Sequence, residues 1–207
     1  MNNSIKFVYF DVGGVLYLDY SKTNKWEEMQ HDLGITQKKS SKFNQLWKKH
    51  ASRVCLDYDV NNLIPILKKE LNLNIPKNYS MLKDFINRFD KNPSIWPVAK
   101  YAKKHYKVGL LTNQYPRMLP LIMQGKQIPN VEWDIVIDSS IVGLQKPDPN
   151  IFKLSQKRAK TKSKYIFYID NDQKHLDSAK NLGWQTFLYD PSNPLKSSKK
   201  LLDFLKN

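Results

Sequence analysis

Five short apolar runs, each followed at once by polar residues, constrain the fold of this chain more than any other feature. They span residues 5–10, 107–111, 134–138, 165–169 and 184–189. Runs of this length that are apolar throughout are typical of strands buried on both faces of a parallel sheet. Helical patterns alternate with them at 94–105, 148–160, 173–182 and 196–206. The alternation predicts an α/β protein with a doubly wound parallel sheet.

The stretch from 18 to 92 interrupts this alternation. Its apolar residues recur at helical spacing, as Leu63, Ile66, Leu67 and Leu71 do, and no strand is predicted in it. Helices are expected near 22–33, 40–53, 60–71 and 78–90. We therefore predict a helical domain over 18–92, inserted into a core made of residues 1–17 and 93–207. Trp26, Trp47 and Tyr58 of the insert are expected to pack in its interior.

The net charge of +15 does not by itself predict a nucleic-acid partner. Only four of the 34 basic residues are arginines, and the lysines occur in scattered pairs that are typical of solvated helix faces. No apolar run is long enough to span a membrane, so no membrane partner is expected. The single cysteine, Cys55, is expected to be inert, and together with the lack of a signal peptide it favours a cytoplasmic protein. The sequence leaves open whether the chain is a monomer or a dimer.

Polar residues of complementary types follow the predicted strands. Asp11 follows the first, Thr112 and Asn113 the second, and Asp170 with Asn171 and Asp172 the fourth, while Lys146 lies in the loop after the third. In doubly wound sheets, ligands bind beyond the carboxyl ends of the strands. A carboxylate, a hydroxyl, a lysine and an acidic cluster at this edge therefore predict an active site.

Four segments resemble the motifs of the haloacid dehalogenase-like hydrolases. They are FDVGGVL at 10–16, LLTN at 110–113, GLQKPDPNIF at 143–152 and YIDND at 168–172, and they occur in the order and spacing of that superfamily. The insert resembles the helical cap that members carry between the first two motifs. The resemblance implies a Rossmann-like catalytic core and hydrolysis of a small phosphorylated substrate through an aspartyl-phosphate.

The resemblance also implies roles for single residues. Asp11 would be the nucleophile, and Thr112, Asn113 and Lys146 would complete the catalytic set. Gly13, Gly14, Thr112, Asn113 and Lys146 would bind the phosphate. Mg²⁺ would be held by Asp11, the carbonyl of Gly13, Asp170 and Asn171, because oxygen donors suit this ion.

Two residues depart from the phosphatase pattern. The position two after the nucleophile is usually an aspartate that protonates the leaving group, and here it is Gly13. The second acid of the fourth motif aligns with Asn171, which offers an uncharged oxygen and predicts a weaker Mg²⁺ site. His175, on the first turn of the following helix, is expected to be exposed.

These departures leave three functions open. The first is the Mg²⁺-dependent phosphatase. The second is a catalytically weak or silent binding protein with the same fold, which the loss of both acids would explain. The third is a metal-independent 2-haloacid dehalogenase, whose family also lacks an acid at the position of Gly13 but carries an aromatic residue there.

Overall fold

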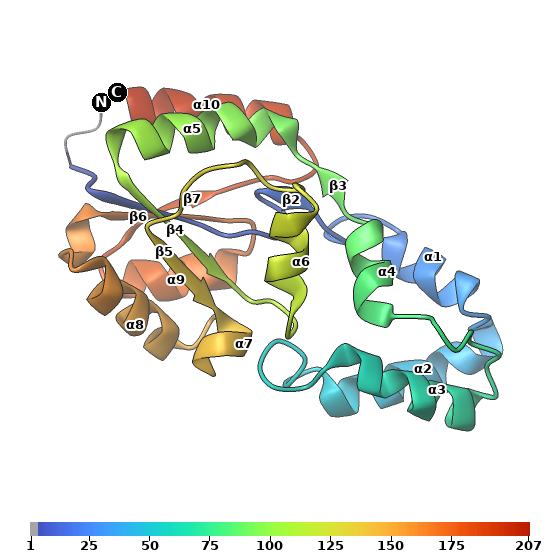
Figure 1. Cartoon of the computed structure of the whole chain (residues 1–207). Helices are drawn as coiled ribbons and strands as arrows, with labels where there is room; N and C mark the ends of the chain where they lie inside the picture. Colours follow the sequence, from blue (N-terminus) through green and yellow to red (C-terminus); the bar gives the residue numbers. More distant parts are fainter. Residues whose placement is uncertain (1–3) are drawn as a thin grey trace.

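A five-stranded parallel sheet forms the centre of the computed structural model, which describes residues 4–207 (Figure 1). Its strands are β1 (Phe7–Phe10), β4 (Lys107–Thr112), β5 (Ile135–Asp138), β6 (Ile166–Asp170) and β7 (Gln185–Leu188). The order across the sheet is β5-β4-β1-β6-β7, and every pairing is parallel. The doubly wound α/β fold predicted from the five apolar runs is therefore confirmed.

Helices cover both faces of the sheet, with α5 and α10 on one face and α8 and α9 on the other (Figure 1). The helices around the sheet are α5 (Trp96–His105), α6 (Met118–Gln124), α7 (Ser139–Val142), α8 (Pro149–Ala159), α9 (Gln173–Asn181) and α10 (Pro194–Lys206), with 3₁₀ turns at Pro93–Ile95 and Ser163–Tyr165. Alternate residues of β1 supply the two cores: Val8 and Phe10 pack on one face, and Phe7 and Tyr9 on the other. Burial on both faces explains why the strands read as unbroken apolar runs.

Helices also make up most of the predicted insert. They are α1 (Lys25–Asp32), α2 (Gln37–His50), α3 (Leu63–Leu71) and α4 (Met81–Asn87), with a 3₁₀ turn at Val60–Asn62. Their buried side chains, such as Met29 and Phe43, belong to the same apolar cluster as Val8 and Phe10 of the sheet. No helix within residues 4–207 has both the length and the apolar character that crossing a membrane would require.

The expectation that the insert contains no strand is wrong at its two ends. β2 (Tyr17–Leu18) and β3 (Asp90–Lys91) pair as a short antiparallel ribbon where the chain leaves the core and returns to it. Strands of two residues are too short to show a period, and their partners are far apart in the sequence. The ribbon holds two segments of the chain side by side, the one that leaves the core after β1 and the one that returns to it.

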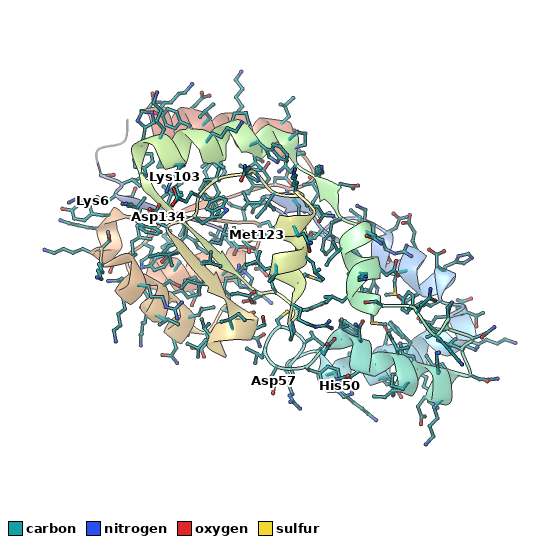
Figure 2. The ribbon with its side chains drawn as sticks, viewed as in Figure 1. Lys6, His50, Asp57, Lys103, Met123 and Asp134 are labelled. Carbon is teal, nitrogen blue, oxygen red and sulfur yellow. The ribbon has the colours of Figure 1, made fainter. Side chains whose placement is uncertain are left out.

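The loop after α2 brings the insert back into contact with the core near α7 (Figures 1 and 2; Asp57 in Figure 2 marks the loop). The Ser139 hydroxyl donates to the carbonyl of Cys55 at 2.5 Å, and the Gln145 amide donates to the carbonyl of Ser52 at 3.2 Å. The insert is therefore attached at a second place besides the ribbon. Burial raises the pKa of the Cys55 thiol to about 12, which disfavours the reactive thiolate form.

Gly109, in the middle of β4, leaves room for the aromatic side chains of β1. A Cβ at this position would lie 2.7 Å from a ring carbon of Tyr9 and 2.9 Å from the carbonyl oxygen of Ile135. Because strand backbone cannot yield, we expect Gly109→Ala to lower the free energy of unfolding by about 1–3 kcal/mol in denaturant titrations. Gly125→Ala is the control, since its nearest neighbour would lie at 3.3 Å, and it should stay within about 1 kcal/mol of wild type.

Candidate active site

Three neighbouring strands deliver polar side chains to one edge of the sheet. Asp11 follows β1, Thr112 ends β4 and Asp170 ends β6, so the strand order β4-β1-β6 places the three next to one another. Asp11 is 6% exposed, and Thr112 and Asp170 are fully buried. Buried carboxylates need charged or hydrogen-bonding partners, so their contacts define the site.

Lys146 joins the two carboxylates. Its Nζ lies 2.9 Å from Oδ1 of Asp11 and 2.7 Å from Oδ2 of Asp170, and it donates to the Tyr168 hydroxyl at 2.9 Å. Asn113 fixes the lysine backbone by two hydrogen bonds of 2.9 Å, one to its carbonyl and one from its N–H. Asn113 therefore positions Lys146, which itself has almost no exposed surface.

The charges of this triad are strongly coupled. Burial, with the neighbouring charge of Asp170, raises the pKa of Asp11 to about 6, although Lys146 opposes the shift. Burial would also raise the pKa of Asp170, but the charge of Lys146 and the hydrogen bond from His175 outweigh it and hold that pKa well below the usual range. Burial disfavours the charged form of Lys146, yet the two carboxylates keep its pKa above the ordinary value. Asp170 and Lys146 are thus an ion pair, and Asp11 is the carboxylate whose charged form is the less favoured of the two.

His175 lies inside the site, so the expectation that it is exposed is wrong. Its Nδ1 is 3.0 Å from Oδ2 of Asp170, and its side chain is 16% exposed. Oδ2 of Asp170 also accepts from the Tyr168 hydroxyl, and Oδ1 accepts from the Asp172 N–H at 2.8 Å. The side chain of Asp172 in turn caps α9 through the Lys174 N–H, which directs the first turn of that helix, with His175, back over Asp170.

A polar pocket of about 210 Å³ opens above this cluster. Of the predicted site residues, Asp11, Gly13, Asn113, Lys146 and Asn171 line it. Gly14, Thr112 and Asp170 lie behind that surface and are not among its lining residues. The pocket thus collects most of the predicted set, together with residues that the motifs did not single out.

Gly14 has a structural reason to be glycine. Its φ is +72°, and a Cβ there would lie 2.4 Å from the side-chain nitrogen of Asn171. The amide of Asn171 donates to the Ser21 hydroxyl at 3.3 Å. Gly14 therefore allows the loop after β1 to pass directly under Asn171.

Gln114 and Tyr17 lie between the Thr112 hydroxyl and the polar pocket, which they line in place of Thr112. Gln114 donates to Oγ1 of Thr112 at 3.1 Å and to the Tyr17 hydroxyl at 3.2 Å, and its own N–H donates to Ser139 at 3.0 Å. Gln114 and Tyr17 both line the pocket. The sequence signal for Gln114 was its position directly after the second motif, at the strand end where ligands bind.

A second, more apolar cavity of about 320 Å³ adjoins the polar pocket between the insert and the core. Aromatic side chains make up much of its lining, including Tyr20, Trp26, Phe85, Phe89 and Tyr115. Four residues line both hollows: Tyr17, Asp19, Asn113 and Gln114. Trp26 packs against Trp47 as expected, but it also faces this cavity.

Comparisons with known proteins agree with this geometry. No family model matches the chain. Pig (Sus scrofa) bifunctional epoxide hydrolase 2 is 23% identical over 221 residues, which covers 96% of this chain and 39% of the pig protein. Mouse (Mus musculus) acyl-CoA dehydrogenase family member 10 is 32% identical over 113 residues, covering 52% of this chain and 10% of that protein. The chain therefore spans about two fifths or less of the length of these curated relatives.

Solved structures share the fold over nearly the whole chain. A HAD family enzyme from Bacteroides thetaiotaomicron has a TM-score of 0.75 at 15% identity, covering 90% of this chain and 94% of that one. The same enzyme in complex with magnesium and inorganic phosphate has a TM-score of 0.70 at 17% identity, with 89% and 94% covered. L-2-haloacid dehalogenase from Xanthobacter autotrophicus, with chloropropionic acid covalently bound, has a TM-score of 0.62 at 17% identity, with 89% and 77% covered. The chain has the fold of the haloacid dehalogenase-like hydrolases, as the order of its motifs predicts.

Proposed function

We propose that this chain is a hydrolase, a Mg²⁺-dependent phosphatase that acts on a small phosphorylated metabolite through an aspartyl-phosphate at Asp11. The observation that carries the proposal is the state of the Asp11 carboxylate. Its Oδ1 accepts from the Val12 N–H at 2.7 Å and from Lys146, whereas Oδ2 accepts no hydrogen bond from any residue in 4–207. An oriented carboxylate that lines a pocket and keeps one oxygen unengaged is a suitable nucleophile.

The reaction follows from this arrangement. Oδ2 of Asp11 attacks phosphorus, the bond to the ester oxygen breaks, and the leaving alcohol departs with that electron pair and takes up a proton. Water then attacks the phosphorus of the aspartyl-phosphate, which releases inorganic phosphate and restores the carboxylate. Lys146 offsets negative charge next to Asp11 throughout, and its partners Asp170 and Asn113 hold it in place before substrate arrives.

A Mg²⁺ ion fits the donors of the polar pocket. Asp11, Asp170 and His175 each offer an atom within 4.8 Å of one another, and Gly13 and Asn171 are among the lining residues of the pocket. Asp11, Gly13, Asp170 and Asn171 would hold the ion, which would offset charge on the phosphate. Because Lys146 already neutralises Asp170 and Asn171 carries no charge, we expect the affinity for Mg²⁺ to be modest.

The aromatic cavity supports a role for the insert in choosing the substrate. In this proposal, residues 1–17 and 93–207 form the catalytic core and residues 18–92 form a cap, with residues 1–3 outside the described structure. The phosphate would lie in the polar pocket and the rest of the substrate in the aromatic cavity. The proposed compartment is the cytoplasm, and neither a nucleic acid nor a membrane is a proposed partner.

Carbon–halogen hydrolysis is the second candidate, because an L-2-haloacid dehalogenase shares the fold. A 2-haloacid carries a carboxylate that needs its own cationic partner. No arginine lines either the polar pocket or the aromatic cavity, and Lys146 is the one lysine that lines them. A 2-haloacid would thus lack a cationic side chain of its own, whereas the proposed Mg²⁺ would offset the charge of a phosphate, and on this ground we prefer the phosphatase.

The test is turnover of an aryl phosphate with Mg²⁺ and with a chelator. We expect chelation to slow release of phosphate by about 10²-fold or more, and acid quenching to trap one phosphoryl group on the peptide that contains Asp11. Release of chloride from 2-chloropropionate at a rate that the chelator does not change would identify a dehalogenase instead. A chain that is stabilised by phosphorylated ligands in thermal unfolding but turns none of them over would be the binding protein.

A further inference from the structure

Gly13 leaves the phosphatase proposed above without an acid at the usual position, and the structure offers a replacement. A Cβ built on Gly13 would lie 2.7 Å from Oδ2 of Asp19. The φ of Gly13 is outside the left-handed region, so its backbone conformation would accept any side chain. The Asp19 carboxylate thus occupies the space into which a side chain at residue 13 would extend.

The Asp19 carboxylate is oriented by its own loop. The residue follows β2, and Oδ1 accepts from the Ser21 N–H at 2.8 Å. Oδ2, the oxygen next to Gly13, accepts no hydrogen bond and forms no ion pair within residues 4–207. The ribbon of β2 and β3 fixes the start of this loop over the sheet edge. This half-buried carboxylate with one unengaged oxygen lines the polar pocket and can contact a ligand there.

Asp19 also stands where the leaving group would pass. It lines both the polar pocket that contains Asp11 and the aromatic cavity beside it. In the proposed substrate pose, the ester oxygen lies between the phosphate in the first hollow and the organic group in the second. Tyr17 marks the same junction, since its hydroxyl would lie 3.5 Å from the Cβ built on Gly13.

We propose that Asp19 is the general acid and base of the reaction, a catalytic residue supplied by the crossover into the cap instead of by the nucleophile loop. This inference rests on the proposed phosphatase function. In the first step the protonated carboxyl of Asp19 gives its proton to the ester oxygen as the bond to phosphorus breaks. In the second step the Asp19 carboxylate takes a proton from the attacking water while the bond between phosphorus and Asp11 breaks, which returns Asp19 to its protonated form.

Asp19→Asn tests this role through the leaving group. With an alkyl phosphate, whose alkoxide is a poor leaving group, kcat should fall about 10²–10⁴-fold. With 4-nitrophenyl phosphate the first step needs little acid, so nitrophenol should appear in a burst of about one equivalent, followed by slow turnover. Phosphate should then be trapped on Asp11, because the base for the second step is missing. KM should fall together with kcat, since breakdown of the intermediate limits turnover, while the Mg²⁺ requirement stays near wild type.

Two further variants keep the test decisive. Asp90→Asn removes an acid from β3 of the same ribbon, where it pairs with Lys25 at the surface, and should preserve the wild-type dependence on the leaving group. Asp19→Ala removes both the acid and the obstacle at residue 13, so adding Gly13→Asp to it should recover much of the lost kcat on the alkyl phosphate.

The outcomes separate the two proposals. Two results would overturn the role of Asp19 but leave the phosphatase proposal intact. In the first, Asp19→Asn lowers kcat equally on both substrates and gives no burst. In the second, Asp19→Asn only raises the Mg²⁺ concentration that the reaction needs. A wild-type chain that neither turns over phosphates nor forms the trapped intermediate would overturn both.

Discussion

Asp11→Asn is expected to abolish turnover and, at the same time, to make the folded chain more stable. Asparagine keeps the shape of the side chain, and its amide oxygen can still accept from Lys146 and from the Val12 N–H. It cannot form the aspartyl-phosphate, so we expect kcat on any phosphate ester to fall by about 10³-fold or more. Steady-state release of phosphate and loss of the trapped intermediate measure this effect.

The gain in stability follows from the direction of the pKa shift. Burial raises the pKa of Asp11 to about 6, above its value in the unfolded chain. Between those two values the folded state keeps a proton that the unfolded state has released, so the free energy of unfolding falls as the pH rises through this range. At pH values above this range the ionised Asp11 lowers the free energy of unfolding by its full amount. The shift in pKa corresponds to at most about 3 kcal/mol.

Asparagine is neutral at every pH, so Asp11→Asn should remove this fall in the free energy of unfolding with rising pH. We therefore expect Asp11→Asn to raise the free energy of unfolding by about 1–3 kcal/mol at neutral pH and to have little effect near pH ~4. Denaturant titrations at the two pH values measure the difference. A variant that is less stable at neutral pH would show that Lys146 contributes more to the ionised carboxylate than burial costs it.

Asp134 provides a control, because its pKa is shifted in the opposite direction to that of Asp11. It lies at the far end of the sheet, beside Lys103 (Figure 2). Burial opposes ionisation there too, but the hydrogen bond from the Val108 N–H and the contact with Lys103 lower the pKa of Asp134. Its ionised form stabilises the fold, so Asp134→Asn should lower the free energy of unfolding at neutral pH. Stabilisation by both variants would indicate a general effect of removing acidic residues.

The parts of this site that the sequence predicts are those fixed by the sheet. Buried parallel strands are apolar throughout, so their ends are visible in the sequence, and the residues at those ends must lie along one edge. Asp11 and Asp170 could be located in this way, and the spacing of the third motif added Lys146. The same reasoning predicts α5, α8, α9 and α10, whose apolar residues recur at helical spacing, but not the short helices α6 and α7.

The residues that the sequence did not predict depend on loop geometry. Asp19 is one of 19 acidic residues, and nothing periodic distinguishes it. Its place beside Gly13 results from the β2–β3 ribbon, which pairs residues from opposite ends of the insert. His175 reaches Asp170 because Asp172 caps α9 and sets the direction of its first turn. A glycine at the position where the phosphatase motif calls for an acid, followed by an acid in the crossover, is the pattern that would have pointed to Asp19.

Lys146→Met is expected to have the largest effect on stability. Methionine fills most of the volume of lysine but leaves Asp11 and Asp170 facing each other without a cation between them. Both carboxyl groups are buried, and removing one partner from a buried ionic cluster costs about 3–5 kcal/mol. Activity should be lost as well, because nothing then offsets charge at the nucleophile. Lys153→Met, on the exposed face of α8, is the control and should change neither property.

The pH dependence of this loss separates electrostatics from packing. Without Lys146, the pKa of each carboxyl group in the folded state should rise, so the folded variant takes up protons that the unfolded chain does not hold. Its free energy of unfolding therefore recovers as the pH falls, and the difference from wild type should shrink markedly between neutral pH and pH ~5. Denaturant titrations of both proteins across this range make the measurement. A difference that stays constant with pH would show that the loss does not come from the two ionised carboxylates, and it would contradict the electrostatic role of Lys146.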